Sequence, residues 1–458
     1  MKYSKYNLIV PNNINKNYYL FNTFNGSCLD INADTANKIQ SGILEGLDEN
    51  TRSLFLKTGV LIKENIDEDK IFSYIHGNEK YNSTHLSATV LLTWACNLRC
   101  VYCFQGHDNR LESMSIEQAD VFINFLTLSA KHKNSKGLSV ILFGGEPLMN
   151  IEVGFYILEK VKLFCDENDL TFSSGIITNG TLLNKAILEK LEEYNCKMIQ
   201  ITLDGTKEIH DVRRIYANGK GSFDATINAL KLVNDFGKFN PVIRVNIDKT
   251  NIKETENLLE YMGVNGLNLT KCTVDFGIVR GETSACSGYS NNCFVEDEIG
   301  DLLYNLWNFA EKHGIRSGLS LIRRTLFCGL YRDSVYTIAP NLDVYKCWEH
   351  VGDKKHLMGK LNKEGNLTNI TYAFYDWMSV DPLKNEECKN CVYLPSCGGG
   401  CGVLSFNETG TYHAKGCFKV KGTVEKQVLK YAEAVMKARE TQKNTEKCSC
   451  TREHECNE

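Results

Sequence analysis

The chain has 458 residues, enough for two to four domains, and its 43% hydrophobic and 24% charged residues are ordinary for a soluble globular protein. The formal net charge of −4 excludes a broad basic field, so we expect no nucleic-acid partner. No segment approaches the length of a membrane span and residues 1–11 lack a signal-peptide core, so we expect no membrane partner and a cytoplasmic location. Nineteen cysteines, many at ligand spacing, then indicate metal binding in a reducing compartment.

Residues 1–85 are predicted to form a separate unit. The sequence over 18–31 predicts a hairpin with its turn at Asn25-Gly26, because this dipeptide favours tight turns between strands. A helix is expected from Ala33, and residues 54–62 predict a second strand, turn and strand. A purely structural N-terminal extension is the alternative interpretation of this unit.

Strand and helix patterns alternate from residue 88 to residue 279. The predicted strands cover 88–93, 138–143, 174–178, 198–203, 241–247 and 273–279. The predicted helices between them cover 116–131, 153–164, 185–194 and 223–236. Such alternation predicts an α/β fold of parallel βα units, with ligand chemistry at the carboxyl ends of the strands.

Three cysteines follow the first of these strands at short spacing: Cys96, Cys100 and Cys103. Three thiolates can hold three irons of a [4Fe–4S] cube and leave the fourth iron open to a ligand. A closed structural site would take four ligands from the protein. The spacing therefore favours a reactive cluster, and a zinc knuckle or a chance grouping is the alternative.

With Tyr102 at the aromatic position, this Cys-x3-Cys-x2-Cys stretch resembles the signature of the radical S-adenosylmethionine (SAM) enzymes. The resemblance implies a partial (β/α)6 barrel, SAM as cofactor, and reductive cleavage of SAM to a 5′-deoxyadenosyl radical that abstracts hydrogen from the substrate. It also implies reduced flavodoxin or ferredoxin as electron donor. Gly144-Gly145-Glu146-Pro147 ends the second strand and resembles the family's GGEP motif, in which the glutamate engages the amino group of SAM.

Polar residues at later strand ends resemble further positions of the family's SAM cleft. For Thr202, Arg213 and Arg244 a structural hydrogen-bond role is an equal alternative, and we interpret His210 as structural. The expected cofactor contacts are Tyr102, Gly144, Gly145, Glu146, Pro147, Thr178, Asn179, Thr202, Asp204 and Arg213.

Seven cysteines in the C-terminal third resemble the SPASM domain, which carries two auxiliary [4Fe–4S] clusters; a zinc ribbon is the alternative. The resemblance implies three clusters in all. It assigns Cys388, Cys391, Cys397 and Cys417 to the distal auxiliary cluster. It assigns Cys328, Cys347 and Cys401 to the proximal one.

The proximal set departs from the family pattern. No cysteine lies between Cys328 and Cys347, where fully ligated members often have one, and Leu342 replaces a usual glycine. An open iron there would accept a substrate cysteine thiolate; an aspartate, a water or an unassigned cysteine is the alternative. The unassigned candidates are Cys286, Cys293 and, beyond a helix predicted over 424–439, Cys448, Cys450 and Cys456.

Residues 1–85 resemble the winged-helix peptide-recognition domain of radical SAM peptide maturases, 86–290 the radical SAM core, and 291–458 the SPASM domain. The expected function is maturation of a ribosomally made, cysteine-containing precursor peptide by a cysteine sulfur-to-carbon thioether crosslink. A carbon–carbon crosslinking maturase, an anaerobic sulfatase maturase that forms formylglycine, and a non-enzymatic scaffold are the alternatives. Sulfatase maturases typically carry an aspartate where this chain has Trp348, followed by Glu349 and His350.

Overall fold

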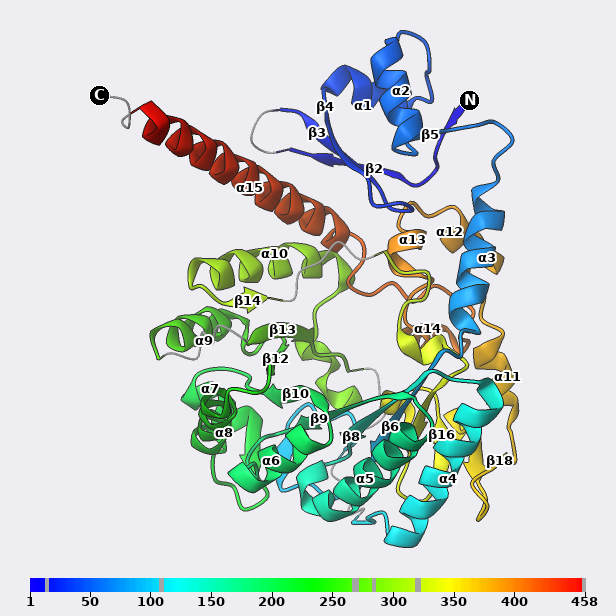
Figure 1. Cartoon of the computed structure of the whole chain (residues 1–458), viewed down its shortest axis with the longest axis vertical. Coiled ribbons are helices and arrows are strands. Elements are labelled where there is room, and N and C mark those ends of the chain that lie inside the picture. The colour runs from blue at the N-terminus through cyan, green and yellow to red at the C-terminus, as the bar shows by residue number, and fades with distance from the viewer. Residues whose placement is uncertain (13–15, 107–110, 266–271, 282–285, 318–322, 455–458) are drawn as a thin grey trace.

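The computed structural model describes residues 1–12, 16–106, 111–265, 272–281, 286–317 and 323–454 (Figure 1). Six parallel strands form its centre, and their bounds are β6 (His85–Leu91), β8 (Gly137–Phe143), β9 (Thr171–Thr178), β10 (Cys196–Thr202), β12 (Val242–Ile247) and β13 (Thr273–Ile278). They lie side by side in chain order, each hydrogen-bonded in parallel to the next. All six predicted strands are confirmed to within a few residues, and so is the predicted α/β fold.

Helices connect consecutive strands, as parallel pairing requires. Their bounds are α4 (Ile116–Lys133), α5 (Ile151–Glu167), α6 (Lys185–Glu193), α7 (Lys207–Arg213), α8 (Phe223–Phe236) and α9 (Ile252–Val264). Local sequence defines some of their ends. For example, Ser115 and Gln118 form a capping box at the start of α4, and Gly237 ends α8 in a left-handed conformation. The helices cover one face of the curved sheet, and its strands contribute the buried core between the two layers (Figure 1).

The sheet continues at both edges. β14 (Arg316–Ser317) extends it beyond β13, and β15 (Val335–Ile338) pairs in parallel with β6. Beyond β15 the pairing is antiparallel through β16 (Asp343–Tyr345), β17 (Gly359–Leu361) and β18 (Leu367–Thr368), which completes eleven strands. β15 and β16 thereby bring the C-terminal cysteine region next to the first strand of the parallel part.

The N-terminal unit contains the predicted hairpin, β3 (Tyr18–Asn22) and β4 (Cys28–Ile31), and a third strand, β2 (Asn7–Pro11), on its other side. α1 (Ala33–Gln40) confirms the helix expected from Ala33, and β1 (Lys2–Tyr3) pairs with β5 (Leu61–Ile62).

The strand predicted from residue 54 is wrong, because residues 54–57 belong to α2 (Glu49–Lys57). Asp48 caps this helix by accepting a hydrogen bond from the Thr51 N–H (2.9 Å). Of the three adjacent apolar residues that suggested a strand, only Phe55 is buried, whereas Leu54 and Leu56 are exposed. A short apolar run does not distinguish a strand from a helix, and here the cap decides.

The N-terminal sheet packs on the C-terminal helix. Leu8, Val10, Tyr19 and Phe21 share a buried cluster with residues of α15 (Thr423–His454), which also packs along α10 (Glu296–Lys312). α3 (Glu68–Lys80) then leads down from this unit to β6 (Figure 1). Of the helices in the described ranges, none combines the length and the apolarity that a membrane crossing needs.

The helix predicted over 424–439 is confirmed, but the prediction that it ends there is wrong, because α15 extends to His454. Cys448 and Cys450 therefore lie within the helix rather than in a tail beyond it. Cys456 lies outside the described residues.

Candidate active site

The loop that carries Cys96, Cys100 and Cys103 leaves the carboxyl end of β6 and is held by a strand from far along the chain. β7 (Leu98–Cys100) pairs antiparallel with β11 (Arg214–Tyr216), which places Cys100 opposite Arg214. At the ends of this ribbon, the Val101 N–H donates to the Arg213 carbonyl and the Ala217 N–H to the Asn97 carbonyl. The sequence predictions missed this pairing, because strands of three residues carry almost no periodic signal.

The three thiols of this loop lie close enough to influence one another electrostatically. Burial is the main cause that raises the pKa of Cys96 to about 11 and of Cys100 to about 12, and neighbouring thiols raise both further. The Leu98 N–H donates to the Cys96 sulfur (3.4 Å). Within the described ranges, no three His, Cys, Asp or Glu side chains converge on one metal ion. A group of three separated thiols fits a cube, whose own irons and sulfides stand between its ligands.

Gly144 and Gly145 bring the end of β8 against the backbone that leads into the cysteine loop. The N–H groups of Gly145 and Glu146 donate to the carbonyls of Thr93 and Ala95 (both 2.9 Å). A Cβ atom on Gly145 would lie 2.4 Å from the Ala95 carbonyl oxygen, and Gly144 has a φ of +144°. Glycine is therefore required here by the close approach of two backbones.

The Glu146 carboxylate is fully buried at this strand end and accepts three hydrogen bonds. Its donors are the Thr178 hydroxyl (2.6 Å), the Asn179 N–H (2.8 Å) and the Leu148 N–H (3.0 Å). Burial raises the pKa of Glu146, and the bonds from Thr178 and Asn179 oppose that shift. Pro147 is buried directly after it, at the start of the short helix η1 (Pro147–Asn150).

This carboxylate network reaches the cysteine loop. The Asn179 side chain donates to the Asn97 side chain (2.8 Å), which in turn donates to the Thr181 hydroxyl (2.8 Å). The structure thus brings the predicted residues of the second and third strand ends to the same place as the loop. Asn97, directly after Cys96, is a contributor that the sequence predictions missed.

Tyr102 is the centre of a second network at the ends of β10 and β12. Its hydroxyl donates to the Asp204 carboxylate and accepts from Arg214 Nη1 (2.7 Å) and from the Asn246 side chain (3.1 Å). The Asn246 N–H also donates to Asp204 (2.9 Å), which is fully buried. Thr202 is buried where β10 ends.

The two adjacent arginines have different environments. Arg213 forms an ion pair with Asp248 (2.8 Å) and its guanidinium lies 4.9 Å from the centre of the Tyr102 ring. These contacts fit the structural hydrogen-bond role that the sequence left open for Arg213 as the alternative to a cofactor contact. Arg214, which was not among the predicted contacts, bonds the Tyr102 hydroxyl directly. His210 accepts from the Asp204 N–H (3.3 Å) and contacts the Ser222 hydroxyl (3.0 Å), which fits its structural interpretation.

Comparison with known proteins agrees with this arrangement. Residues 90–262 match the Radical SAM superfamily. Residues 90–262 of this chain are therefore a radical SAM domain. Over 325 residues it is 25% identical to the cysteine-type anaerobic sulfatase-maturating enzyme of Clostridium novyi (strain NT), which covers 67% of this chain and 84% of that relative. Over 339 residues it is 26% identical to the mycofactocin maturase MftC of Mycolicibacterium smegmatis, with coverages of 70% and 80%.

The fold of this radical SAM enzyme is also similar to that of a solved structure, Streptococcus suis SuiB bound to its precursor peptide SuiA. The TM-score is 0.53 at 16% identity, and the match covers 91% of this chain and 98% of SuiB. A radical SAM domain implies SAM and one [4Fe–4S] cluster as cofactors. The grouped thiols of Cys96, Cys100 and Cys103 fit that cluster.

The radical SAM enzyme has a second group of cysteines around a small cavity beside the N-terminal unit. The cavity has an apolar wall formed by Tyr393, Leu394 and Val420. All four cysteines of the predicted distal set, Cys388, Cys391, Cys397 and Cys417, line it. Cys397 and Cys417 lie in two separate segments of the chain, and a parallel β-bridge between Gly400 and Gly416 brings these segments together.

Cys328, Cys347 and Cys401 form a third group. Cys401 raises the pKa of both other thiols, although burial is the larger cause in each case. Arg280, at the end of β13, donates to the Cys401 sulfur (3.4 Å) and forms an ion pair with Glu349. Arg280 was missed from the sequence, and its only signal was its position directly after a predicted parallel strand.

Cys286 lies near the first group, because it contributes to the raised pKa of Cys103. It is buried after the end of β13. Cys293 lies at the end of the short helix η2 (Ser287–Asn292). Neither side chain is among the residues around the four-cysteine cavity.

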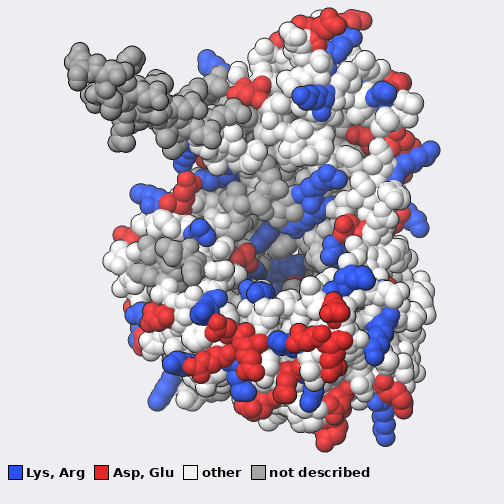
Figure 2. Space-filling view, in the orientation of Figure 1, with Lys and Arg blue, Asp and Glu red and all other residues white. Residues whose placement is uncertain are grey.

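The view in Figure 2 shows a hollow in the middle of the molecule, between the N-terminal unit above and the barrel below. Lys and Arg side chains gather on its walls, whereas Asp and Glu gather on the outside of the barrel. The hollow therefore has a positive local field in a chain whose formal net charge is −4.

We expect Tyr102→Phe to destabilise the network at the ends of β10 and β12 by about 1–3 kcal/mol, because Asp204 and Arg214 each lose a hydrogen-bond partner. Calorimetry should show a lower unfolding midpoint, and equilibrium dialysis should show weaker SAM binding. Tyr216→Phe is the matched control on β11, since no hydrogen bond to its hydroxyl is found among the described residues. Equal midpoints and equal SAM affinities for the two variants would contradict the prediction.

Proposed function

We propose that this radical SAM enzyme modifies a ribosomally made, cysteine-containing precursor peptide by joining a cysteine sulfur to a carbon of another residue. The contrast between the two C-terminal cysteine groups supports this proposal. Four cysteines line the distal cavity, whereas the proximal group has three, Cys328, Cys347 and Cys401. A cube held by three thiolates keeps one iron available for an outside ligand. A substrate thiolate is a ligand that iron accepts.

We propose the same division of the chain as the sequence suggested. Residues 1–85 recognise the peptide, 86–290 hold SAM and its cluster, and 291–458 form a SPASM domain with two auxiliary [4Fe–4S] clusters. The match to SuiB, a protein that was solved with its precursor peptide, covers 91% of this chain and supports a peptide substrate. The mycofactocin maturase among the relatives supports it too.

In this proposal Cys96, Cys100 and Cys103 hold the cluster that binds SAM, and the chain's other residues position the reactants. When bound, the reduced cluster and SAM supply a 5′-deoxyadenosyl radical, with reduced flavodoxin or ferredoxin as the source of the electron. Glu146, kept in place by Thr178 and Asn179, would accept a hydrogen bond from the amino group of SAM. Tyr102 and its hydrogen-bond partners hold the loop in place.

The crosslink would remove one hydrogen atom from carbon, which would end in 5′-deoxyadenosine, and one proton from the thiol, which would go to solvent; the one remaining electron would pass to an iron–sulfur cluster. We therefore expect each crosslink to make the peptide about 2 Da lighter, and to resist dithiothreitol, because a thioether does not undergo thiol exchange. The test is mass spectrometry of a short cysteine-containing peptide encoded beside this gene, after anaerobic incubation with enzyme, SAM and reductant. Recovery of the mass with dithiothreitol, or a 2 Da loss with every cysteine still alkylatable, would contradict the thioether proposal.

Formylglycine formation on a sulfatase is the second candidate, favoured by the 25% identity to a sulfatase-maturating enzyme over 84% of that relative. The match covers 67% of this chain, so about a third of the chain has no counterpart in it. A sulfatase peptide that gains an aldehyde, detected with a hydrazide probe, would favour this candidate. The thioether proposal expects no aldehyde.

A further inference from the structure

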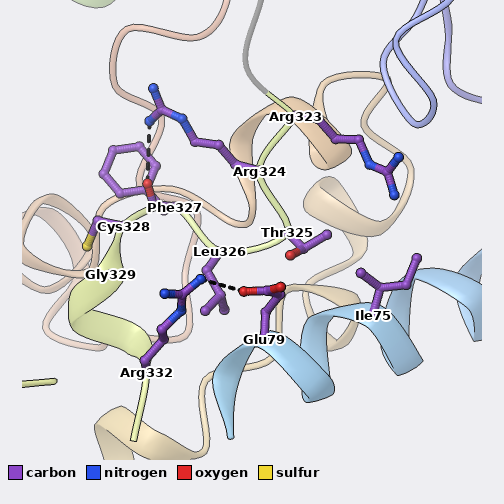
Figure 3. A pocket seen from close by; sticks show the side chains of 10 residues that line it. All are labelled: Ile75, Glu79, Arg323, Arg324, Thr325, Leu326, Phe327, Cys328, Gly329 and Arg332. Carbon is purple, nitrogen blue, oxygen red and sulfur yellow. Dashed lines mark hydrogen bonds and ion pairs between the residues drawn. The ribbon is translucent and has the colours of Figure 1, made fainter. Parts of the chain in front are cut away.

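A cavity of about 540 Å³ lies between α3 and the segment that follows residue 322 (Figure 3). This volume is within the range of small-ligand pockets, about 300–1,000 Å³, and far too small for a folded partner. Ile75 and Glu79, one turn apart on α3, form one wall, and residues 323–329 form the other. The two walls are joined where the His76 ring contacts the Thr325 carbonyl (2.7 Å).

The cavity is lined by more positive than negative charge. Three arginines line it, and only Arg332 has a carboxylate partner, Glu79. Arg323 lies over the Phe24 ring, 5.6 Å from its centre, and Arg324 over the Phe327 ring at 6.0 Å. Across the described ranges, no Asp or Glu forms an ion pair with either of these two. A guanidinium that lies over an aromatic ring and has no ion-pair partner is suited to bind a carboxylate through two parallel hydrogen bonds.

The arginine side chains do not converge on one point. In Figure 3, Arg323 and Arg324 extend in opposite directions from adjacent backbone positions, and Arg332 lies below both, beside Glu79. A single small anion cannot contact all three groups. Carboxylates spaced along an extended chain can.

The position of the cavity also fits a chain that passes through it. Phe24 belongs to the turn between β3 and β4 of the N-terminal unit, and Cys328 of the proximal cysteine group lines the far end of the cavity. The sulfur of Cys328 points away from α3, toward the other side of the segment (Figure 3). The cavity therefore lies between the unit proposed to recognise the peptide and the cysteines proposed to bind its thiol.

We propose that Arg323, Arg324 and Arg332 bind the carboxylates of an acidic segment of the peptide substrate, between the recognised region and the residue that reacts. This inference rests on the proposed peptide substrate and adds its chemical class. An acidic electron-donor protein is the alternative partner that a group of arginines could bind. The concave shape and small volume favour a single extended chain.

The test measures binding of fluorescein-labelled hexaglutamate to the anaerobically reconstituted full chain by fluorescence anisotropy. We expect saturable binding that weakens with added salt, and little binding of labelled hexaglutamine. The double variant Arg323→Gln/Arg324→Gln should bind hexaglutamate roughly tenfold or more weakly, because two charge-assisted contacts are lost. Lys185→Gln, which removes an exposed cation on α6, should bind like the original enzyme.

A second variant controls for misfolding. Arg323→Lys/Arg324→Lys keeps both charges but loses the planar fork, so its affinity should fall between those of the enzyme and the glutamine variant. Unchanged affinity in the glutamine variant would overturn the inference, whether or not that variant is reduced more slowly by flavodoxin. Displacement of hexaglutamate by equimolar inorganic phosphate would also overturn it, because the site would then be one for small anions.

The two proposals fail separately in this design. Hexaglutamate binding that depends on Arg323 and Arg324, together with no crosslinked product from any precursor peptide, would support the acidic site and reject the thioether function. Thioether formation with hexaglutamate binding that ignores both arginines would reject the acidic site alone.

Discussion

The triple variant Cys96→Ala/Cys100→Ala/Cys103→Ala should lose all formation of 5′-deoxyadenosine. These three are the only cysteines of the sequence between β6 and α4, and without their thiolates a cube cannot be held at the end of β6. We expect the reconstituted variant to contain about four fewer irons per chain. Anaerobic chromatography of the products and chemical iron analysis measure the two effects independently.

A matched control separates this loss from a general effect of removing thiols. Cys28→Ala removes a half-buried thiol in the N-terminal sheet, far from the loop in the chain, and should keep both iron and SAM cleavage. SAM cleavage by the triple variant under reducing conditions would refute the assignment of the loop as the cluster site. Loss of activity in Cys28→Ala as well would show that the effect is not specific to the loop.

The second large effect concerns the C-terminal cysteines. If all three cysteine groups hold a cube, the reconstituted enzyme should contain about twelve irons and as many sulfides per chain. Cys388→Ala/Cys391→Ala should reduce the iron to about eight, because only two thiols would remain at the cavity that four now line. The variant should keep the irons of the other two groups.

Zinc analysis of the same samples distinguishes the alternative. Four thiols around one cavity also suit tetrahedral zinc, and stoichiometric zinc would make this group a structural ribbon. A total of about four irons would refute both auxiliary clusters while leaving the SAM cluster intact. The thioether proposal would then lose its support, since it depends on an open iron in the proximal group.

Much of the barrel was predictable because its signals are local. The six parallel strands were found from apolar runs separated by helical patterns, and the structure moves their bounds by only a few residues. The exceptions were short elements. Leu54, Phe55 and Leu56 looked like a strand, but a cap six residues before the first of them begins a helix, and β7 and β11 were too short to predict.

Some residues of the candidate site were predicted from the sequence and others were not. Glu146, Thr178 and Asn179 were proposed from separate strand ends, and the fold brings all three into one network. Arg214 and Arg280 were not among the predicted cofactor contacts, yet they bond Tyr102 and Cys401. The sequence around an arginine does not indicate which distant residue its side chain will contact.

The amino-acid sequence was enough to recognise the reactive groups of this chain: three thiols at short spacing in one loop, a glycine pair before a carboxylate, and a second set of cysteines near the C-terminus. The residues of each feature are close together in the sequence, so they stay close together in the folded chain. The four cysteines that line one cavity are the four that the resemblance had already grouped, whereas the position of Arg323, Arg324 and Arg332 opposite α3 became visible only in the folded chain. The arginine grouping depends on contacts between segments more than 200 residues apart, which the packing of the whole core sets and no local sequence pattern records.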